Sequence, residues 1–580
     1  MDLTETHSYK CKVNVTLRST KPVVGCEINP FVSVRSEGPL PAPSRDYSVS
    51  YKWYREQKFC SIHHDKMATF QCVSCVKLNI TRKESYHCST KCFLNSWQAH
   101  MWRHRLKMET STDDKQTIRK LRSCGSWPEF GSECLSNEKA VVMEEEKEWL
   151  LVSCSKNYVP KMDDLGLTLK LECVAVDFSS NTALSDLNVT LTDPVIEFPT
   201  AQPRCIVQIQ CPRESSSLCS TSLNGIHFSV LSYNILSDLY TNQKYHYCPS
   251  WALVWEYRRH NLLREIIEYS ADIICLQEVQ SDHFENFFKP ELTKEGYMVV
   301  YKKRTNEVYT GKQFVTDGCA TFYRNDLFKE VAKYEIEFNK KTSPVVEALK
   351  SELRNEASIR LKKDNIALVV ILGTPKYCHT YNAFPSRVCV VNAHICSDPK
   401  FPDVKLFQVV TLINELEKIL QPEIPLLICG DFNSVPKSDP HTFMVTGRLE
   451  YSDSVDPYGV YQHLKLDHQF SLASAYASFG LAVGKQERHL GKFNLKTREP
   501  ILTFFSPRFS KTLDYIFFTE CFLIVNSLEL EGVLELLDNK DLAAGLPSPL
   551  WSSDHIALMA TFRMLPKNHP ATARKQADPS

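Results

Sequence analysis

The chain has 580 residues, and its 68 Lys and Arg balance 68 Asp and Glu, so the formal net charge at pH 7 is zero. This balance excludes a uniformly basic protein held on nucleic acid by overall charge, although it leaves room for a local basic groove. Hydrophobic residues make up 43% and charged residues 23%, an ordinary globular composition that argues against a wholly disordered chain. No run of about 18 apolar residues occurs and the N-terminus lacks the apolar core of a signal peptide, so we expect an intracellular protein without membrane spans.

Two segments of the N-terminal region are predicted to be rich in strands. Residues 1–57 contain alternating apolar stretches around a Pro-rich loop, and residues 148–212 contain short strand-like runs punctuated by Pro, Asp and Asn. We expect a β-rich segment in the first and a small β-sandwich-like module in the second. Between them lie a cluster of Cys and His at 58–105 and a polar, charged linker at 106–147.

The pattern changes after residue 226. Up to residue 564, strand-like runs such as HFSVLSYNIL and IPLLICGDFN alternate with amphipathic segments, of which 255–267 and 407–420 have helical spacing of their apolar residues. An alternation of this length predicts one large α/β domain. The last residues, 565–580, are predicted to be a disordered tail.

Polar side chains recur at the ends of the apolar runs in this domain, where they can project from a sheet edge into a cleft. A single Asp, Asn or His at such a place is more often a turn former or a structural residue than a catalyst. The joint pattern is harder to explain in that way, because one run after another ends in a group that can bind a hard cation or move a proton. The residues are Asn234, Glu278, His394, Asp431, Asn433, Asp514, Asp554 and His555.

These groups suit phosphodiester hydrolysis. A hard oxygen ligand such as Glu278 favours Mg²⁺, which polarises phosphoryl oxygens and shields their charge. Asp431 with Asn433 could deprotonate or orient a water molecule. His555 could donate to the charge that develops on the phosphoryl group, provided that a carboxylate keeps it oriented and protonated. No thiol or hydroxyl stands beside an obvious base, so a covalent enzyme intermediate is not indicated.

The motifs SYNIL, LQEV, GDFNS, LDYIFF and SSDH, in this order, resemble the exonuclease–endonuclease–phosphatase superfamily over residues 226–564. The resemblance implies a DNase I-like fold, a four-layer α/β sandwich with two packed mixed sheets. It also implies that Glu278 binds one or two Mg²⁺ ions and that Asp554 is a second candidate ligand. By the same resemblance the catalytic residues are Asn234, His394, Asp431, Asn433, Asp514 and His555.

Longer strings indicate which substrate to expect among those of the superfamily. YHYCPSWALVWEYRR, DGCATFYR, KDNIALVVIL and AHICSDPKFPDVKLFQ are similar to the poly(A)-specific deadenylases of the carbon catabolite repressor four group. The implied reaction removes adenylates from the 3′ end of mRNA and releases 5′-AMP. Phe509 stands where that group places a base-stacking Phe, and Pro399 matches a Pro that packs near the terminal base. Phe504 and Pro507 depart from the animal enzymes, which carry polar residues there.

The cluster at 58–105 contains four pairs of metal-ligand residues. Cys60 precedes His63 by three residues, with His64 as a competitor, and the remaining pairs are Cys72 with Cys75, Cys88 with Cys92, and His100 with His104. Eight such ligands in 45 residues predict two tetrahedral Zn²⁺ sites, and so small a unit would depend on the metal for much of its stability. The alternative is a set of buried free Cys with incidental His.

The string YHCSTKCFLNSWQAH resembles a MYND-type zinc finger, a family that cross-braces its ligand pairs. The resemblance implies one zinc held by Cys60, His63, Cys88 and Cys92 and a second held by Cys72, Cys75, His100 and His104. The chain departs from the usual pattern because His, rather than Cys, stands at the second and last positions. MYND fingers dock short peptides rich in Pro and Leu.

The combination resembles the plant-type deadenylases, which carry a zinc finger where the animal and fungal enzymes carry leucine-rich repeats. The resemblance implies poly(A) as substrate, binding of the CCR-associated factor deadenylase through the finger, and membership of the CCR–NOT complex. It further implies a cytoplasmic location, with processing bodies and the nucleus as further places. Two alternatives are a same-fold enzyme acting on another substrate, such as a 2′-phosphate or 2′,5′-linked oligoadenylate, and an inactive zinc-finger scaffold.

Overall fold

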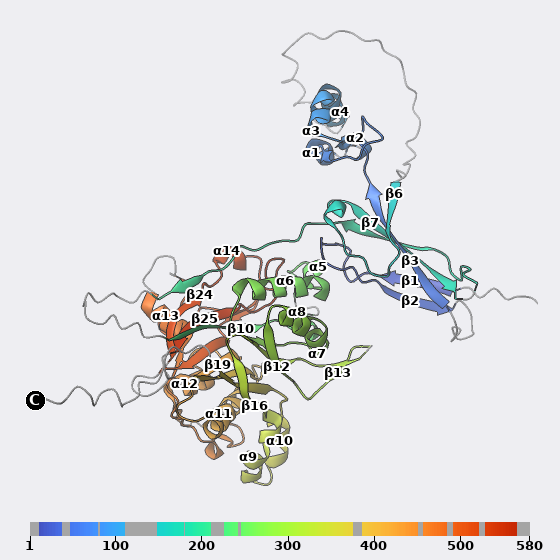
Figure 1. The fold of residues 1–580 in the computed structure, drawn as a ribbon. Coiled ribbons are helices and arrows are strands. Elements are labelled where there is room, and N and C mark those ends of the chain that lie inside the picture. The colour runs from blue at the N-terminus through green and yellow to red at the C-terminus, as the bar shows by residue number, and fades with distance from the viewer. Residues whose placement is uncertain are drawn as a thin grey trace, which may run out of the picture. The chain divides into compact units, whose positions relative to one another are not determined.

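The computed structural model describes residues 11–36, 47–78, 80, 82–110, 148–178, 180–209, 225–241, 245–311, 313–374, 386–450, 456–483, 491–520 and 528–564 (Figure 1). The chain divides into two compact units, Met1–Phe198 and Pro199–Ser580. The predicted tail at 565–580 and most of the predicted linker lie outside the described residues. Where the linker begins, the structure differs from the prediction, because helix α4 (Trp97–Thr110) continues past residue 105.

The second unit contains two mixed sheets. The seven-stranded sheet has the order β12-β15-β11-β10-β25-β24-β9, and the six-stranded sheet has the order β16-β17-β18-β19-β23-β20. In the first sheet the strands are β9 (Ile206–Gln208), β10 (Ile226–Asn234), β11 (Ile273–Gln277), β12 (Tyr297–Lys303), β15 (Gly318–Arg324), β24 (Leu528–Leu534) and β25 (Leu558–Met564). In the second they are β16 (Lys329–Glu337), β17 (Ile366–Gly373), β18 (Arg387–His394), β19 (Leu426–Asp431), β20 (Leu472–Ser474) and β23 (Asp514–Thr519).

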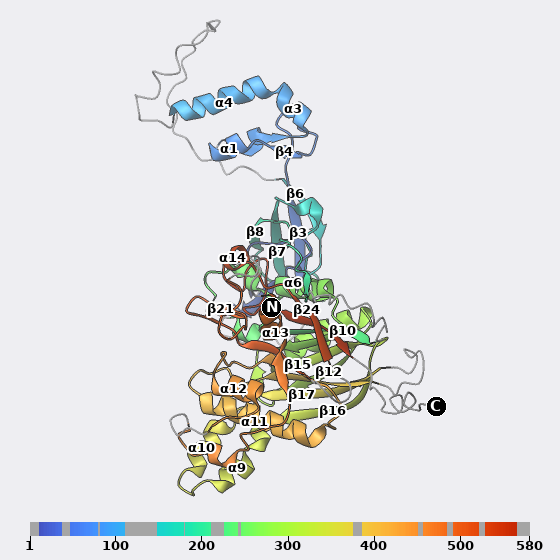
Figure 2. The ribbon, with the colours of Figure 1, turned by 90° about the vertical axis from the view of Figure 1, so that its left-hand side faces the viewer.

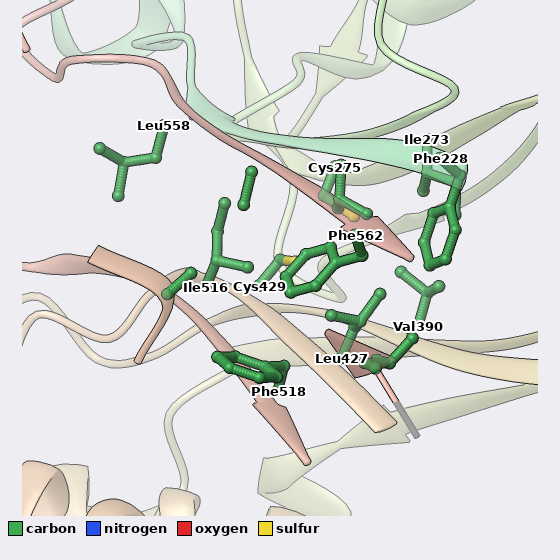
Figure 3. Close-up of a cluster of buried hydrophobic side chains, with 14 of the residues drawn as sticks. Phe228, Ile273, Cys275, Val390, Leu427, Cys429, Ile516, Phe518, Leu558 and Phe562 are labelled. Atoms are coloured by element: carbon green, nitrogen blue, oxygen red, sulfur yellow. The ribbon is translucent and has the colours of Figure 1, made fainter. Parts of the chain in front are cut away.

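The two sheets pack face to face around an apolar core. Figure 3 shows Phe228, Cys275 and Phe562 from the first sheet against Leu427 and Phe518 from the second. Alternation along the strands creates this arrangement, because neighbouring side chains point to opposite faces of a sheet. In β10, for example, Val230 belongs to the core between the sheets, whereas Leu231 packs on the outer, helical side.

Helices cover the two outer faces and complete four layers. Helix α6 (Trp255–Tyr269) packs Leu262 and Ile266 against the first sheet, and α11 (Pro402–Ile419) packs Phe407 and Ile413 against the second (Figure 1). This is the four-layer sandwich that the resemblance implied. The shorter helices are α5 (Ser250–Leu253), α7 (Ser281–His283), α8 (Lys289–Lys294), α9 (Ser343–Ala348), α10 (Arg354–Leu361), α12 (Asp439–Thr446), α13 (Ala475–Val483) and α14 (Asn539–Leu542). Two hairpins, β13 (Val308–Tyr309) with β14 (Phe314–Val315) and β21 (Phe504–Ser506) with β22 (Phe509–Lys511), lie outside the main sheets.

The first unit joins segments that the sequence analysis treated as separate modules. Strand β3 (Tyr47–Gln57) pairs with both β6 (Glu148–Ser153) and β7 (Thr168–Asp177), and β8 (Asn188–Pro194) completes the sheet. Residues from β1 (Cys11–Thr16) and from the β2 (Phe31–Ser36) segment share one core with this sheet, centred on the fully buried Trp53. The two predicted modules are therefore one β domain, and the Cys/His cluster is inserted in its chain between β3 and β6.

A second boundary also differs from the prediction. Residues 206–208 fell within the predicted module at 148–212, but β9 pairs with β24 and so belongs to the edge of the seven-stranded sheet. Among the described helices, none combines the length and the apolar character needed to cross a bilayer.

The inserted cluster folds as short helices with one two-stranded sheet, β4–β5 (Figure 2). Its elements are β4 (Phe70–Gln71), α1 (Val73–Lys77), α2 (Arg82–Ser85), β5 (Tyr86–His87), α3 (Thr90–Asn95) and α4. The Ser89 hydroxyl oxygen accepts a hydrogen bond from the backbone N–H of Cys92 and so begins α3.

Candidate active site and metal clusters

The topology brings the polar strand ends to one place. Strands β10 and β11 are parallel, as are β18 and β19, so their carboxyl ends with Asn234, Glu278, His394 and Asp431 share one end of each sheet. Strands β23 and β25 run antiparallel to their neighbours and start at this same end. Asp514 and His555 therefore arrive beside residues that lie far before them in the sequence, Asp514 for instance beside Asp431.

Asn234 links the two sheets at this end. Its side-chain amide donates one hydrogen bond to Oε1 of Glu278 and another to Oδ2 of Asp431, both at 3.1 Å. The first acceptor follows β11 and the second ends β19, so one buried amide sets the spacing between two carboxylates. A short amide with two N–H donors is the group that can hold two carboxylates in this way.

Glu278 lies in a constrained and water-poor position. Its φ angle is 58°, in the left-handed region that a Glu seldom adopts, and the backbone N–H of Ser237 donates to Oε2 at 3.0 Å. Burial, followed by the charges of Asp317 and Asp554, raises the pKa of Glu278 to about 7. A carboxylate held in this way gains most from a nearby cation, which would compensate both the burial and the repulsion.

Both carboxylate oxygens of Asp431 accept hydrogen bonds from other residues of the protein. The backbone N–H of Asn433 donates to Oδ1 at 2.8 Å, and burial followed by the charge of Asp514 raises the pKa of Asp431 to about 7. The preceding residue, Gly430, has a φ of 146°, and a Cβ there would lie 1.9 Å from the carbonyl oxygen of Ala393. Only glycine allows β18 and β19 to approach this closely before the Asp.

His555 contacts the carboxylate of Asp514, which in turn is held by the hydroxyl of Thr503. Its Nδ1 lies 2.8 Å from Oδ2 of Asp514, and the same oxygen accepts a hydrogen bond from the Thr503 hydroxyl at 2.6 Å. Although burial works in the opposite direction, the carboxylates of Asp514 and Asp431 raise the pKa of His555 well above its ordinary value. The ring is thus an imidazolium. Its Nε2 lies 3.7 Å from Oδ2 of Asp431, and the Nε2–H can donate to a bound anion.

His394 has the opposite protonation state. The guanidinium of Arg304 donates to its Nδ1 at 3.0 Å, and because Arg has no acceptor, Nδ1 must be unprotonated. Nε2 consequently carries the proton, and it is buried without a hydrogen-bond partner among the described residues, 3.9 Å from Oε1 of Glu278. Burial and the Arg304 charge hold the pKa of His394 well below its ordinary value. His394 is therefore a neutral donor that faces the centre of the site.

Asp554 contacts the centre from the loop that precedes β25. Its Oδ2 accepts a hydrogen bond from the Tyr245 hydroxyl at 2.6 Å, while Oδ1 lies 4.0 Å from Nε2 of His555. The string YHYCPSWALVWEYRR, which distinguished the deadenylase group, supplies Tyr245. It also holds the same loop elsewhere, for instance through Arg258, whose Nε donates to the carbonyl of Ser552 at 2.9 Å.

Three predicted residues are placed differently from the rest. The side-chain amide of Asn433 donates to the backbone carbonyl of Ile395 at 3.0 Å, so the part of this residue that contacts Asp431 is its backbone N–H. Pro399 is exposed in the loop after β18. Phe509 is 46% exposed on the β21–β22 hairpin, and its ring centroid lies 6.2 Å from that of Phe504, which in turn lies 4.9 Å from the ring of His555.

Sequence reasoning did not identify several residues that shape the site, namely Ser237, Tyr245, Arg304, Asp317 and Thr503. Asp317 holds Arg304 with a separation of 3.1 Å between Oδ2 and Nε, and it accepts a hydrogen bond from Tyr240 at 2.8 Å. One signal was available for Asp317, because it precedes a strand that runs antiparallel to β11 and so starts at the same sheet edge. The others lie in loops, where apolar periodicity carries no information.

The donor set fits a divalent cation. Ligand atoms of Asp431, Asp514 and His555 lie within 4.8 Å of one another, and the buried Oδ1 of Asp554 has no hydrogen-bond partner among the described residues. Carboxylate oxygens dominate this set, which is the chemistry of hard ions such as Mg²⁺. His394 and the imidazolium of His555 are both excluded as Nε2 ligands because that nitrogen carries a proton in each ring, so the carboxylates are the candidate ligands.

The Cys/His insertion gathers two further sets of ligand atoms in the first unit. Cys60, His63, Cys88 and Cys92 form one group, and Cys72, Cys75, His100 and His104 form the other. In the first, Nδ1 of His63 lies 3.4 Å from the Sγ atoms of both Cys88 and Cys92. His63, rather than His64, therefore stands with the cysteines.

The second group contains two His from one helix face. Nε2 of His100 and Nε2 of His104 both lie 3.2 Å from Sγ of Cys75, as the i, i+4 spacing on α4 allows. Burial, followed by the neighbouring His104, lowers the pKa of His100 to about 4, so its ring is neutral, the form that binds metals. The pairing of the segments is the cross-braced one.

Several known proteins are similar to this chain in sequence. The model of the Endonuclease/Exonuclease/phosphatase family matches residues 231–555. A protein of Arabidopsis thaliana named carbon catabolite repressor protein 4 homolog 1 is 41% identical over 604 residues, which cover 96% of this chain and 98% of the relative. A protein of Mycosarcoma maydis named CCR4-Not complex 3′-5′-exoribonuclease subunit Ccr4 is 35% identical over 58% of this chain and 50% of its own.

A solved structure titled ANGEL2, a 2′,3′-cyclic phosphatase, is 29% identical with a TM-score of 0.47, over 63% of this chain and 99% of that one. The family match spans the motifs from β10 to His555, and the Arabidopsis relative matches over nearly the whole length. Both matches confirm the resemblance predicted from the motifs. The chain therefore belongs to the endonuclease/exonuclease/phosphatase family and, within it, to the carbon catabolite repressor protein 4 homologues.

Proposed function

We propose that this protein is an Mg²⁺-dependent 3′-to-5′ poly(A) exoribonuclease that releases 5′-AMP as a subunit of a CCR–NOT assembly. The observation that carries the proposal is the linked set Glu278–Asn234–Asp431, with the protonated His555 beside it. The fungal relative named as a 3′-5′-exoribonuclease subunit supports the reaction and the assembly. The strings shared with the deadenylase group support adenylate as the base.

Each residue of the site has a distinct task in this proposal. Glu278 and the free oxygen of Asp554 would hold Mg²⁺, which when bound shields the phosphoryl charge and makes phosphorus easier to attack. Asp431, with its pKa of about 7, is suited to accept a proton from the attacking water at neutral pH. His555 donates from Nε2 to a phosphoryl oxygen, and Asp514 keeps it charged.

His394 and the exposed Phe509 complete the substrate contacts. His394 donates from Nε2 to a second phosphoryl oxygen and, being neutral, does so without adding charge to the cation site. Phe509, on its hairpin, offers a ring face on which an unpaired base can stack, the usual way in which single-stranded RNA is held. Pro399 would lie against the terminal base.

Trimming of defined RNA tests this function. Full-length protein with Mg²⁺ is incubated with the same RNA body carrying either a 3′ A-tail or a 3′ U-tail, and 5′-AMP is measured. We expect the A-tail to be shortened stepwise and the U-tail to be spared, with Glu278→Gln inactive towards both. Equal trimming of both tails, or of neither, would contradict the assignment. Release of phosphate from a 2′-phosphorylated dinucleotide cofactor, or cleavage of 2′,5′-linked oligoadenylate, would favour the same-fold alternative.

The Cys/His insertion is proposed to be a MYND-like finger with two structural Zn²⁺ ions that binds the CCR-associated factor deadenylase. The two four-residue ligand groups support the metal, since Cys and His side chains whose ligand atoms lie within 4.8 Å of one another suit zinc. Several exposed apolar side chains on α3 and α4 support the docking role, because monomeric proteins seldom expose many such groups in a small unit. These side chains are Leu94, Trp97, Met101, Trp102 and Leu106.

A further inference from the structure

The two oxygens of the Asp554 carboxylate have different surroundings. Oδ2 accepts a short hydrogen bond of 2.6 Å from the hydroxyl of Tyr245. Oδ1 is buried and has no hydrogen-bond partner among the described residues, although it lies 4.0 Å from Nε2 of His555. A buried carboxylate oxygen without a donor is costly, so this oxygen is placed for a ligand rather than for the protein.

Tyr245 is well suited to hold this carboxylate. Its side chain is buried, and its ring lies at 81° to that of Tyr247 with 6.2 Å between centroids. A tyrosine hydroxyl carries its proton at neutral pH and a carboxylate can only accept, so Tyr245 is the donor in this hydrogen bond. With Oδ2 engaged, rotation of the carboxylate would break the hydrogen bond, and Oδ1 stays directed at the centre of the site.

The neighbouring contacts of the same string act on the backbone of the loop instead. The hydroxyl of Tyr247 donates to the carbonyl of Leu546, and that of Tyr257 donates to the carbonyl of Pro549. Such bonds hold the course of the loop but leave the Asp554 side chain free to turn. The Tyr245 hydroxyl is the donor that determines the direction of the carboxylate itself.

We propose that Tyr245 is a positioning residue that presents Oδ1 of Asp554 to the divalent cation of the reaction centre. The inference deepens the proposed function and rests on it for the identity of the reaction. Without the hydroxyl, Asp554 can turn towards the imidazolium of His555, and the ion pair formed there would compete with the cation. Groups that orient a metal ligand in this way typically change metal affinity by about 10–100-fold when they are removed.

A pair of matched variants tests the role. Tyr245→Phe removes the hydroxyl that contacts the carboxylate, whereas Tyr247→Phe removes a hydroxyl that holds the same loop through its backbone. Mn²⁺ binding to the full-length proteins is measured by calorimetry without RNA, together with the unfolding temperature. We expect the dissociation constant for Mn²⁺ to rise about tenfold or more in Tyr245→Phe and to stay within about twofold of the wild-type value in Tyr247→Phe.

A Mg²⁺ titration of trimming supplies the second readout. Half-maximal activity of Tyr245→Phe should require about tenfold more Mg²⁺ than that of the wild type, with kcat restored at saturation. An unchanged dissociation constant for Mn²⁺, an equal loss in both variants, or a kcat that excess Mg²⁺ does not restore would overturn the role. If the wild type trims no RNA, the proposed function fails, while the Mn²⁺ measurement still decides whether Tyr245 positions the ligand.

Discussion

Asp431 and Asp514 face each other as register partners where β19 ends and β23 begins. Both are buried, and their ligand atoms form one group with that of His555. Two carboxylates in such a position repel each other, and the arrangement is stable only with a positive charge between or beside them. The imidazolium of His555 supplies one positive charge, and a divalent cation would supply more.

The first prediction concerns the pH dependence of cation binding. Burial raises the pKa values of Glu278 and Asp431 to about 7, with contributions from neighbouring carboxylates, so each tends to hold a proton at lower pH. A cation must displace that proton, and its affinity should therefore rise with pH. For one displaced proton we expect Mn²⁺ binding to tighten about tenfold between pH 6 and pH 8. Calorimetry in buffers of different ionisation enthalpy measures both affinity and proton release, and a flat profile would contradict the prediction.

The second prediction concerns the charge on His555. Asp514 raises the pKa of His555, so Asp514→Asn should lower the pKa of His555. The activity needs the protonated ring, so the alkaline limit of the pH profile should move to a lower pH in this variant. We also expect a fall in kcat of about 10²–10⁴-fold near neutrality. Thr503→Val keeps Asp514 but removes the hydroxyl that donates to the same carboxylate oxygen and accepts from the backbone N–H groups of Leu513 and Asp514. An alkaline limit that does not move in Asp514→Asn would show that His555 is not the acid.

The third prediction tests whether Arg304 affects catalysis through His394 or only stabilises the fold. Arg304 imposes the Nε2-protonated form on His394, so Arg304→Met should reduce kcat, while Arg304→Lys should retain more activity because it keeps a donor. In a background with His394→Gln, the same Arg304→Met change should have little further effect. Single and double variants compared in a double-mutant cycle measure this dependence. Independent, additive losses would mean that Arg304 acts on something other than His394.

The fourth prediction concerns the finger. Trp102 and Leu106 are 61% and 58% exposed and take no part in the ligand groups. Trp102→Ala with Leu106→Ala should therefore keep two zinc ions per chain while losing co-purification with the partner deadenylase. Cys88→Ser with Cys92→Ser should lose zinc and the partner together. Zinc is counted by elemental analysis, and retention of the partner by either double variant would contradict docking through this surface.

The fifth prediction concerns the contact between the two sheets beneath the site. The side-chain amide of Gln277 donates to Asn392 at 2.9 Å, and Asn392 donates to the backbone carbonyl of Leu276 at 3.1 Å. All of these groups are buried, and Asn392→Ala would remove both hydrogen bonds, although the amide of Gln277 would keep its bond to the carbonyl of Cys275 at 3.0 Å. We expect a loss of about 1–3 kcal/mol in the free energy of unfolding, measured with denaturant. A change near zero would show that the amide is replaced without cost.

The residues at strand ends were predictable because they follow directly from a local pattern. An apolar run that ends in Glu278 or Asp431 marks the residue as the tip of a buried strand, and the order of the motifs identifies the family. The gathering of Cys and His into two groups was predictable for the same reason, since the spacing of Cys88 and Cys92 is local. For Asn433 the motif indicated the residue, but only the structure distinguished its backbone N–H from its amide.

Other features depend on pairs that are remote in sequence. Tyr245 and Asp554 are 309 residues apart, and Arg304 and His394 are 90 apart, so no local spacing connects them. The union of β3 with β6 and β7 is of the same kind, because alternation tells which face of a strand is buried but not which strand lies beside it. The sequence by itself determined the chemistry that the site could contain. The tertiary structure decided which donor orients each reacting group, because that choice depends on packing between distant segments.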